Sequence, residues 1–282
     1  MIPKPIIIDI SEWQNPNQMN YDLLAKQVSG VIIRVQYGSL YLDKEFKKHI
    51  LEFKKRKIPI AVYAWVRGTS ISDMKQEAKD FYQRANEFEP SFWWLDVEEQ
   101  SMADMETGCE TYRATLKQLG AKKVGVYVAN HLFQEFHLAV KKFDGLWIPT
   151  YGKNTGEYQG SDPTATNLFD LHQYTSFGKL SGYSGYLDFN RIVQKGIDYF
   201  FDDKVKEEKA GIMMKTLKTV ATYVNLRSQP EVGNNVIAKL PKGASVLIND
   251  IVIANGFVWG VQPRSDGSKG YVDIGQSVPW IN

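Results

Sequence analysis

Short apolar segments recur along the first part of the chain, each bounded by polar or turn-forming residues. We expect these segments to be strands: Ile6–Ile10, Val31–Gln36, Ile58–Val66, Phe92–Glu98 and Val124–Val128. Runs of this length and composition are typical of strands buried in a parallel sheet. Helix-like stretches lie between them, for example Asp43–Lys57, Ile71–Phe88 and Asp104–Leu119. This repeated alternation of strand and helix predicts an α/β domain.

The pattern changes after Val128. Further strand candidates, separated by loops that contain Gly, Ser and Pro, are Leu146–Thr150, Leu171–Tyr174 and Tyr186–Phe189. A helix-like stretch, His131–Lys142, precedes them, and Arg191–Phe201 has the pattern of a closing helix. We therefore predict an irregular TIM-like α/β barrel over residues 1–201, with about five βα units followed by about three strands. A regular eightfold barrel would need more helix in this region.

The last part of the chain has a different character. Residues 202–214 are rich in Asp, Glu and Lys and are predicted to form a linker. Residues 215–282 contain short strand candidates separated by Gly, Pro, Asn and Asp: Val220–Leu226, Val236–Leu240, Ser245–Ile253, Phe257–Val261 and Gly270–Val272. This spacing predicts a small all-β domain, either a barrel or a sandwich.

Composition and charge narrow the classes of partner. Apolar residues make up 43% and charged residues 23% of the chain, and the net charge is +2. Residues 215–282 carry seven Lys/Arg and four Asp/Glu, a net of +3. This asymmetry fits either docking on an anionic surface or ordinary scatter of surface charge. No basic patch indicates nucleic-acid binding, and apolar runs such as Pro59–Val66 are too short to span a membrane.

Little in the sequence favours a metal, a cofactor or export. Cys109 is the single cysteine, so an intrachain disulfide is excluded. The four histidines show no metal-ligand spacing, and we expect neither a metal nor a cofactor. The first apolar stretch ends at Asp9 without a cleavage site, so we expect no signal peptide.

The sharpest chemical feature lies at the end of Phe92–Glu98, where acids abruptly follow an apolar run. Side chains alternate along a strand, so Asp96 and Glu98 share one face, with Cα atoms roughly 6.5 Å apart. Parallel barrels place active sites at this end of their strands. Repulsion between the two carboxylates raises one pKa, which provides an acid for cleaving a glycosidic bond. The alternative is a pair of strand-end acids that cap the next helix.

Two more acids are expected at the same end of the barrel. Asp9 ends the first strand candidate, and Asp188 belongs to the last one. First and last strands become neighbours when a barrel closes, so Asp9 and Asp188 should flank each other and face Asp96 and Glu98. Bringing four carboxyl groups together in a partly buried place costs free energy unless they bind a ligand or share protons.

Aromatic residues gather near these strand ends. They are Tyr37, Tyr63, Trp65, Tyr127, Trp147, Tyr151 and Tyr174. Aromatic rings stack on the C–H faces of sugars while carboxylates bind the hydroxyl groups, so we expect these residues to bind substrate. For any single member of the set, core packing is the alternative.

The ordered motifs resemble glycoside hydrolase family 25 lysozymes. Asp9–Gln14 matches the opening Asp-x-Ser-x-x-Gln, and Leu95–Glu98 matches the Asp-x-Glu strand. The resemblance continues through Val124–Tyr127, Leu146–Tyr151, Gln173–Tyr174 and the closing segment Gly178–Asn190, so that it covers about residues 5–195. One departure is His172, where relatives often carry Trp and where a substrate contact is expected to differ.

The resemblance implies N-acetylmuramidase activity, which cleaves the β-1,4 bond between N-acetylmuramic acid and N-acetylglucosamine. It also implies a barrel of five βα units and three further strands. Glu98 would be the general acid/base, and Asp96 would orient the acetamido group or stabilise developing positive charge. Asp9 and Asp188 would complete the acidic cluster, and Gln173 would join the aromatic residues in binding substrate. Close carboxylates favour retention of configuration, with the choice between Asp96 and the substrate acetamide as nucleophile left open.

The C-terminal part resembles bacterial SH3-type domains, which bind peptidoglycan peptides or wall polymers. Val224–Pro230, with the sequence Val-Asn-Leu-Arg-Ser-Gln-Pro, resembles their Leu-Asn-Val-Arg-Ser-Gly-Pro hallmark, and Lys242–Gly243, Trp259 and Gly270–Val272 also fit. A lysozyme barrel with such a module and no signal peptide resembles a bacteriophage endolysin. Such an enzyme would stay in the host cytoplasm until holins release it, and would then attack the wall of a Gram-positive host.

Met213 and Met214 suggest a second translation product. They stand at the start of the predicted wall-binding domain, after Lys206–Lys209, whose codons could resemble a ribosome-binding site. An internal start there would yield a free wall-binding module that associates with the full-length enzyme.

Three alternatives to the endolysin hypothesis remain open. A chitin-cleaving barrel glycosidase also uses strand-end acids, although its longer run of alternating aspartates is missing here. A non-catalytic wall-binding protein on a hydrolase fold would have lost at least one of the acids. A bacterial autolysin would normally carry an export signal.

Overall fold

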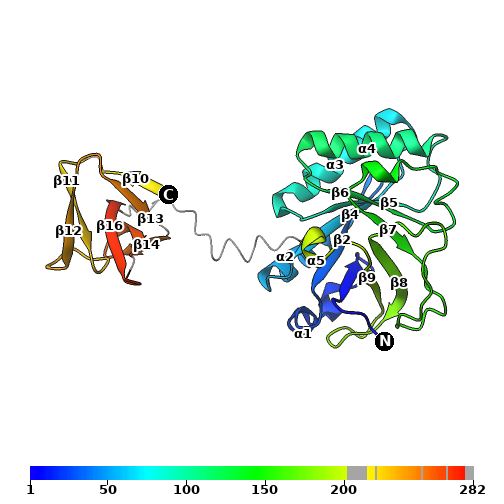
Figure 1. Ribbon diagram of the computed structural model, residues 1–282, viewed down its shortest axis with the longest axis horizontal. Coiled ribbons are helices and arrows are strands. Elements are labelled where there is room, and N and C mark those ends of the chain that lie inside the picture. Colours follow the sequence, from blue (N-terminus) through cyan, green and yellow to red (C-terminus); the bar gives the residue numbers. More distant parts are fainter. Residues whose placement is uncertain (202–214, 220, 249, 265, 277–282) are drawn as a thin grey trace. The chain divides into compact units, whose positions relative to one another are not determined.

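The computed structural model describes residues 1–201, 215–219, 221–248, 250–264 and 266–276. The chain divides into two compact units, Met1–Asp203 and Lys204–Asn282, which are considered separately below (Figure 1). The predicted linker at residues 202–214, with Met213 and Met214, lies outside the described residues.

The first unit is a closed barrel of mixed strands. Its strands are β1 (Ile7–Ile10), β2 (Gly30–Tyr37), β4 (Ile60–Trp65), β5 (Trp93–Val97), β6 (Val124–Val128), β7 (Leu146–Pro149), β8 (Leu171–Gly178) and β9 (Leu187–Ile192). The strand order is β1-β9-β8-β7-β6-β5-β4-β2, and β1 pairs with β2 to close the barrel. All neighbours are parallel except β9, which runs antiparallel to both β8 and β1. The short β3 (Tyr41–Leu42) extends from β2 as a hairpin.

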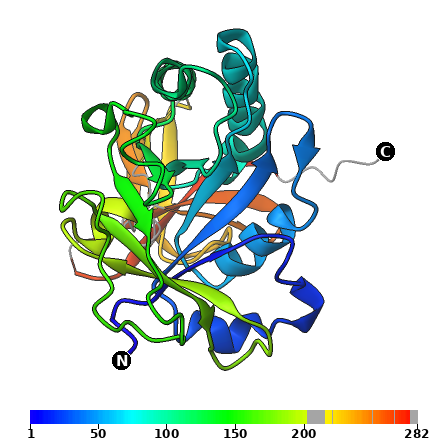
Figure 2. The same ribbon diagram turned by 90° about the vertical axis from the view of Figure 1, so that its right-hand side faces the viewer.

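Helices connect the first five barrel strands. They are α1 (Tyr21–Ala25), α2 (Phe46–Lys55), α3 (Ile71–Ala85) and α4 (Met105–Leu119), with short 3₁₀ turns η1 (Pro16–Gln18) and η2 (Asn86–Phe88). Side chains of Asn20, Ser70 and Asp104 accept backbone N–H groups and so cap the starts of α1, α3 and α4. The helices cover the barrel on the side of β1 to β6, whereas loops cover β7 to β9 (Figures 1 and 2). Among the described residues, no helix is both long and apolar enough to cross a membrane.

The predicted helix at His131–Lys142 is wrong. The segment forms turns and ends in the 3₁₀ turn η3 (Val140–Lys142). Phe136 and Leu138 are both buried, which one face of a helix cannot achieve for positions two apart. His137 between them has a φ of 47°, in the left-handed region that interrupts a helix. The barrel therefore has four α-helical crossovers in its described part rather than about five.

The predicted closing helix at Arg191–Phe201 is largely wrong as well. Strand β9 continues to Ile192, where Arg191 pairs with His172 on β8 and donates to its Nδ1 at 3.0 Å. Helix α5 spans just Ile197–Phe200. Phe200 and Phe201 are buried against the apolar side chains inside the barrel. The conformation of this segment is therefore set by the packing of these two rings and not by its helical pattern.

Side chains inside the barrel form layers. Towards the amino ends of the strands the interior is apolar, with Ile7, Ile32, Trp94 and Leu171 in one cluster with Phe200. Strand alternation puts the residues two positions further along β1, β2, β5 and β8 on the same inward face. These residues are polar: Asp9, Arg34, Asp96 and Gln173. Gly125 on β6 leaves space for this packing, because a Cβ there would lie 2.3 Å from the Trp94 ring. The barrel interior is thus apolar near the amino ends of the strands, which we call the floor, and polar near their carboxyl ends, which we call the mouth.

The described part of the second unit is rich in strands. A five-stranded antiparallel sheet has the order β12 (Val236–Pro241), β11 (Tyr223–Arg227), β16 (Lys269–Gln276), β15 (Phe257–Pro263) and β14 (Asp250–Ala254). A separate pair joins β10 (Lys215–Lys218) to β13 (Ser245–Ile248). The predicted single strand Ser245–Ile253 is therefore two strands with different partners, and β10 was not predicted. Leu226, Val246, Ile248 and Val272 form the apolar core.

One carboxyl group is buried between the barrel and its helical layer. Glu77 on α3 is 1% exposed, and its two oxygens accept the backbone N–H of Arg67 at 3.3 and 3.2 Å. Burial raises the pKa of Glu77 to about 8, and the N–H of Arg67 offsets only part of this effect. The folded state then holds a proton that the unfolded state releases. This contribution to stability is therefore present below pH 4.5 and is lost as the pH rises through about 8.

We predict that Glu77→Gln reduces this loss, because the neutral amide keeps an oxygen for Arg67 and cannot ionise. At pH 5 the melting temperature should match or fall slightly below that of the wild type. At pH 8.5 it should exceed the wild-type value by roughly 2–8 °C, corresponding to about 1–2 kcal/mol. Calorimetry at both pH values, with the exposed Glu106→Gln on α4 as control, tests this. An equal difference at both pH values would contradict it.

Candidate active site

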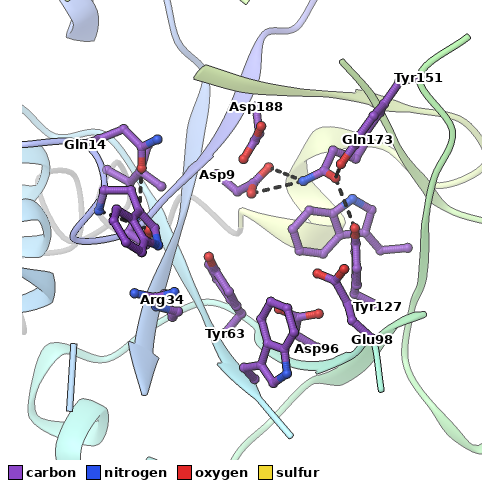
Figure 3. Close-up of a pocket in the computed structure, with 15 residues that line it drawn as sticks. Asp9, Gln14, Arg34, Tyr63, Asp96, Glu98, Tyr127, Tyr151, Gln173 and Asp188 are labelled. Atoms are coloured by element: carbon purple, nitrogen blue, oxygen red, sulfur yellow. Dashed lines mark hydrogen bonds between the residues drawn. The ribbon is translucent and has the colours of Figure 1, made fainter. Parts of the chain in front are cut away.

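Four acidic side chains meet in a pocket at the carboxyl ends of the barrel strands. Asp9 lies on β1, Asp96 on β5, Glu98 just after β5, and Asp188 on β9. In Figure 3, Asp9 and Asp188 lie beside each other, and Asp96 and Glu98 lie across the pocket from them. The hollow has a volume of about 190 Å³ and is lined by Asp9, Ile10, Ser11, Trp13, Gln14, Arg34, Tyr63, Trp65, Asp96, Glu98, Tyr127, Trp147, Tyr151, Gln173 and Asp188.

Asp9 is buried but well supplied with hydrogen bonds. Its Oδ1 and Oδ2 accept from Gln173 Nε2 at 3.1 and 3.0 Å, and Oδ2 also accepts from Asn190 Nδ2 at 2.7 Å. Burial raises the pKa of Asp9 to about 6, and these amide donors keep it from rising further. Donors aimed at both oxygens favour the ionised form of Asp9 at neutral pH.

Asp188 is the protonated partner of Asp9. The antiparallel pairing of β1 with β9 sets the two residues directly opposite each other. Burial, followed by the negative charge of Asp9, raises the pKa of Asp188 to about 9. Asp188 therefore holds a proton at neutral pH and shares it with Asp9 through a hydrogen bond.

Asp96 and Glu98 form the second acidic pair. Asp96 is 4% exposed, and burial together with the charge of Glu98 raises its pKa well above the ordinary value. Burial also raises the pKa of Glu98, which is partly exposed to the pocket. Burial and close spacing therefore both oppose simultaneous ionisation of the two carboxyl groups. Asp96 Oδ1 is buried and has no hydrogen-bond partner within the described part of the chain.

Arg34 adds a positive charge to the pocket lining, but most of its charge is already paired. Its Nε donates to Asp43 Oδ2 at 3.0 Å, and its Nη2 lies 3.3 Å from Glu12 Oε1. The guanidinium lowers the pKa of Asp96, but less than burial raises it. Sequence reasoning missed Arg34, although a charged residue inside the apolar run Val31–Gln36 was the available signal.

Aromatic rings line the pocket above the apolar floor. Trp147 is 2% exposed, and its ring packs edge-on against Tyr127 at 4.6 Å and Trp94 at 5.6 Å. Tyr63 and Tyr151 are partly buried and point into the same pocket (Figure 3). Of the predicted set, Tyr63, Trp65, Tyr127, Trp147, Tyr151 and Gln173 therefore meet here.

Tyr37 and Tyr174 do not line the pocket. The Tyr37 ring lies behind Trp65, 5.2 Å away, and the guanidinium of Arg67 lies 4.6 Å from its centre. Tyr174 is 2% exposed and packs into the outer core against Phe189. Since side chains alternate along β8, Tyr174 and its neighbour His172 face away from the pocket that Gln173 enters. His172, the position where relatives often carry Trp, thus does not line this pocket.

Sequence reasoning also missed an exposed tryptophan at the rim. Trp13 lines the pocket and is 77% exposed. Its loop is held in place, since Ser11 Oγ accepts the Trp13 N–H at 3.3 Å and Gln14 Oε1 accepts the Ser11 N–H at 2.9 Å. Glu12 N–H also donates to Asp43 at 3.0 Å. These hydrogen bonds hold the loop so that it presents an indole ring beside the acidic pocket.

This chain is similar in sequence and in structure to known glycosyl hydrolases. The model of the glycosyl hydrolases family 25 matches residues 8–183. A glycosyl hydrolase 25 of Streptococcus pneumoniae, the virulence factor GHIP, is 41% identical over 70% of this chain and 93% of its own, with a TM-score of 0.67. The catalytic domain of endolysin ply40, from bacteriophage P40 of Listeria monocytogenes, is 26% identical over 71% and 96%, with a TM-score of 0.64.

A more distant structure shares the fold. The CTP1L endolysin is 24% identical over 69% of this chain and 68% of its own, with a TM-score of 0.58. No curated protein sequence matched the chain. The family model spans more than half of the chain, and the pneumococcal hydrolase exceeds 40% identity over nearly all of its own length. The chain therefore belongs to glycosyl hydrolases family 25, whose members are glycoside hydrolases of the lysozyme type.

Proposed function

We propose that this protein is an N-acetylmuramidase that cleaves the β-1,4 bond between N-acetylmuramic acid and N-acetylglucosamine in peptidoglycan. The observation that carries the proposal is the pair Asp96 and Glu98 at the barrel mouth, the first buried and the second partly exposed, both with raised pKa values. Glycosidic cleavage requires an acid that is protonated near neutral pH, with a second carboxylate close by. Family membership and the likeness to a phage endolysin support the peptidoglycan substrate.

Exposure suggests how the pair divides its work. Glu98 is the more exposed of the two and reaches the open pocket, so it is the group that meets the glycosidic oxygen and acts as general acid/base. Asp96 lies deeper, and its Oδ1, which has no hydrogen-bond partner among the residues that the structure describes, can accept a hydrogen bond from the acetamido group or stabilise developing positive charge. Asp9 supplies negative charge on the far side of the sugar, and Asp188 supplies a carboxylic proton as a hydrogen-bond donor.

The second unit is proposed to be an SH3-like wall-binding domain. It contains a hollow of about 560 Å³ whose lining includes Tyr223, Asn225, Trp259 and Ile274. Tyr223 is 54% exposed, and Asn225 Oδ1 is buried without a hydrogen-bond partner among the described residues. An apolar hollow with an unused acceptor suits a wall peptide or polymer that brings an N–H or O–H donor.

The proposed biological setting is lysis of a Gram-positive host by a bacteriophage endolysin. The likeness to the endolysin of the Listeria phage supports it. In this setting the enzyme waits in the host cytoplasm, is released through holin pores, and then acts on the cell wall. The CTP1L endolysin is described as regulated by a secondary translation product, which supports a similar product here that starts at Met213 or Met214.

We predict that Glu98→Gln lowers the rate of reducing-end release from purified Gram-positive walls by on the order of 10²–10⁴, because the variant lacks the acid. Glu106→Gln on the exposed face of α4 is the matched control and should retain full activity. Equal clearing by wild type and Glu98→Gln would show that Glu98 is not the acid. Binding without sugar release by the wild type would favour a wall-binding protein, and release from chitin would favour a chitinase.

We predict that Asn225→Ala weakens binding of the full-length chain to purified walls about five- to tenfold, the effect of losing one hydrogen bond. The measurement uses the Glu98→Gln background, so that the wall stays intact during sedimentation. Asn234→Ala, at an exposed position outside the hollow, is the control. Equal binding by the two Asn variants would place the wall-binding site elsewhere.

The internal start predicts a second species in untagged preparations, with the mass of a chain that begins at Met213 or Met214. Mass spectrometry of the purified product detects it, and replacing both methionines with leucine should abolish it. A preparation that contains the full-length chain alone would remove this part of the proposal.

A further inference from the structure

Gln173 connects Asp9 to two phenol groups. It lies on β8 and is 4% exposed. Its Nε2 contacts both carboxylate oxygens of Asp9, at 3.1 and 3.0 Å. Its Oε1 accepts from the hydroxyl of Tyr127 at 3.1 Å and from that of Tyr151 at 2.6 Å (Figure 3). Both lone pairs of the amide oxygen are thus occupied, and the amide nitrogen faces the carboxylate.

The two phenols fix the orientation of the amide. Burial raises the pKa values of Tyr127 and Tyr151, so both hydroxyl groups keep their protons and can donate. If the amide turned over, its oxygen would face Asp9. An oxygen facing Asp9 is tolerable only when Asp9 is protonated and donates. The orientation of one amide is therefore coupled to the charge of one carboxyl group.

Apart from Asp188, whose hydrogen bond lowers the pKa of Asp9, the titratable groups around Asp9 are acidic, or are already paired with other residues. Asp188 faces it from β9, and Asp96 and Glu98 face it from β5 and the residues just after it. Tyr63 on β4 is close enough to interact with Asp9, and Arg34 on β2 is paired with Asp43 and Glu12. The negative charge of Asp9 therefore depends on the neutral donors of Gln173 and Asn190 and on the hydrogen bond from protonated Asp188.

We propose that Gln173 is a positioning residue that keeps Asp9 ionised, with its amide locked by Tyr127 and Tyr151, so that the shared proton stays on Asp188. This role replaces the substrate contact expected for Gln173, because its oxygen is filled and its nitrogen is directed at Asp9. The consequence for activity rests on the proposed muramidase function. The consequence for the titration of Asp9 does not.

The first test is the titration of Asp9 followed by ¹³C NMR in protein labelled at the Asp carboxyl carbons, with the signal assigned by its loss in Asp9→Asn. In Gln173→Leu, which removes the donor at similar volume, the transition should move at least one pH unit higher. Tyr127→Phe/Tyr151→Phe should move it in the same direction by a smaller amount. Gln118→Leu, at an exposed position on α4, should leave it unchanged.

The second test is the pH profile of wall hydrolysis. If the active enzyme needs ionised Asp9, the acidic limb of kcat/KM should move up by the same amount in Gln173→Leu. That shift corresponds to about a tenfold loss at pH 5 and little loss at pH 8. An equal loss at every pH, with an unchanged Asp9 titration, would mean that Gln173 only supports packing and would overturn the proposal.

Two further outcomes are distinguishable. If the Asp9 transition moves as expected but the wild type releases no reducing ends at any pH, the proposed muramidase function fails and the role of Gln173 stands. If Gln173→Leu does not fold, the Phe double variant decides, since it keeps the glutamine and both rings. An unchanged Asp9 transition in that variant would overturn the claim that the phenols lock the amide.

Discussion

The burial of carboxyl groups at one end of the barrel is the constraint on which the rest of this site depends. Burial raises the pKa values of Asp9, Asp96, Glu98 and Asp188, and the negative charges of neighbouring acids raise those of Asp96, Glu98 and Asp188 further, so the site opposes full ionisation. The free-energy cost of placing these carboxyl groups together is reduced because each pair shares protons and because the site opens to a pocket. An array of acids that must stay partly protonated is the chemistry that a glycosidase requires.

The irregular closure of the barrel produces one of these pairs. Strand β9 runs antiparallel to both neighbours, which places Asp188 opposite Asp9 in the ladder and brings Asn190 within 2.7 Å of Asp9. A parallel strand with a crossover helix would not produce this antiparallel pairing. The apolar floor of Trp94, Trp147 and Phe200 supports the same end of the barrel from below and keeps water from reaching the acids from that side. The departure from eightfold regularity is therefore tied to the chemistry of the site.

The sequence allowed the acids to be predicted because their signals are local. Period-two alternation puts Asp96 and Glu98 on one face, and closure of any barrel makes Asp9 and Asp188 neighbours. The prediction that Tyr174 lines the pocket was wrong by the same rule, since a residue next to inward-facing Gln173 must face outward. The prediction for Tyr37 was wrong for a different reason: Tyr37 pairs with Trp65 in the β2–β4 ladder, and its ring packs against Trp65 and Arg67 instead of lining the pocket. The helix predicted around His137 does not form, because the burial of alternate residues outweighs the helical pattern of the segment.

The pairing of Arg34 shows why the site stays acidic. A free guanidinium among four carboxyl groups would stabilise their charged forms and remove the proton that the chemistry needs. Asp43, itself 1% exposed, and Glu12 take up that charge from the outer side. Tyr41 and the Lys44 N–H in turn hold the Glu12 carboxylate, so the rim loop that carries Trp13 and the charge balance of the pocket depend on the same contacts. Neutral amides then support Asp9 without lowering the neighbouring pKa values as a cation would, which explains why glutamine and asparagine rather than lysine or arginine surround it.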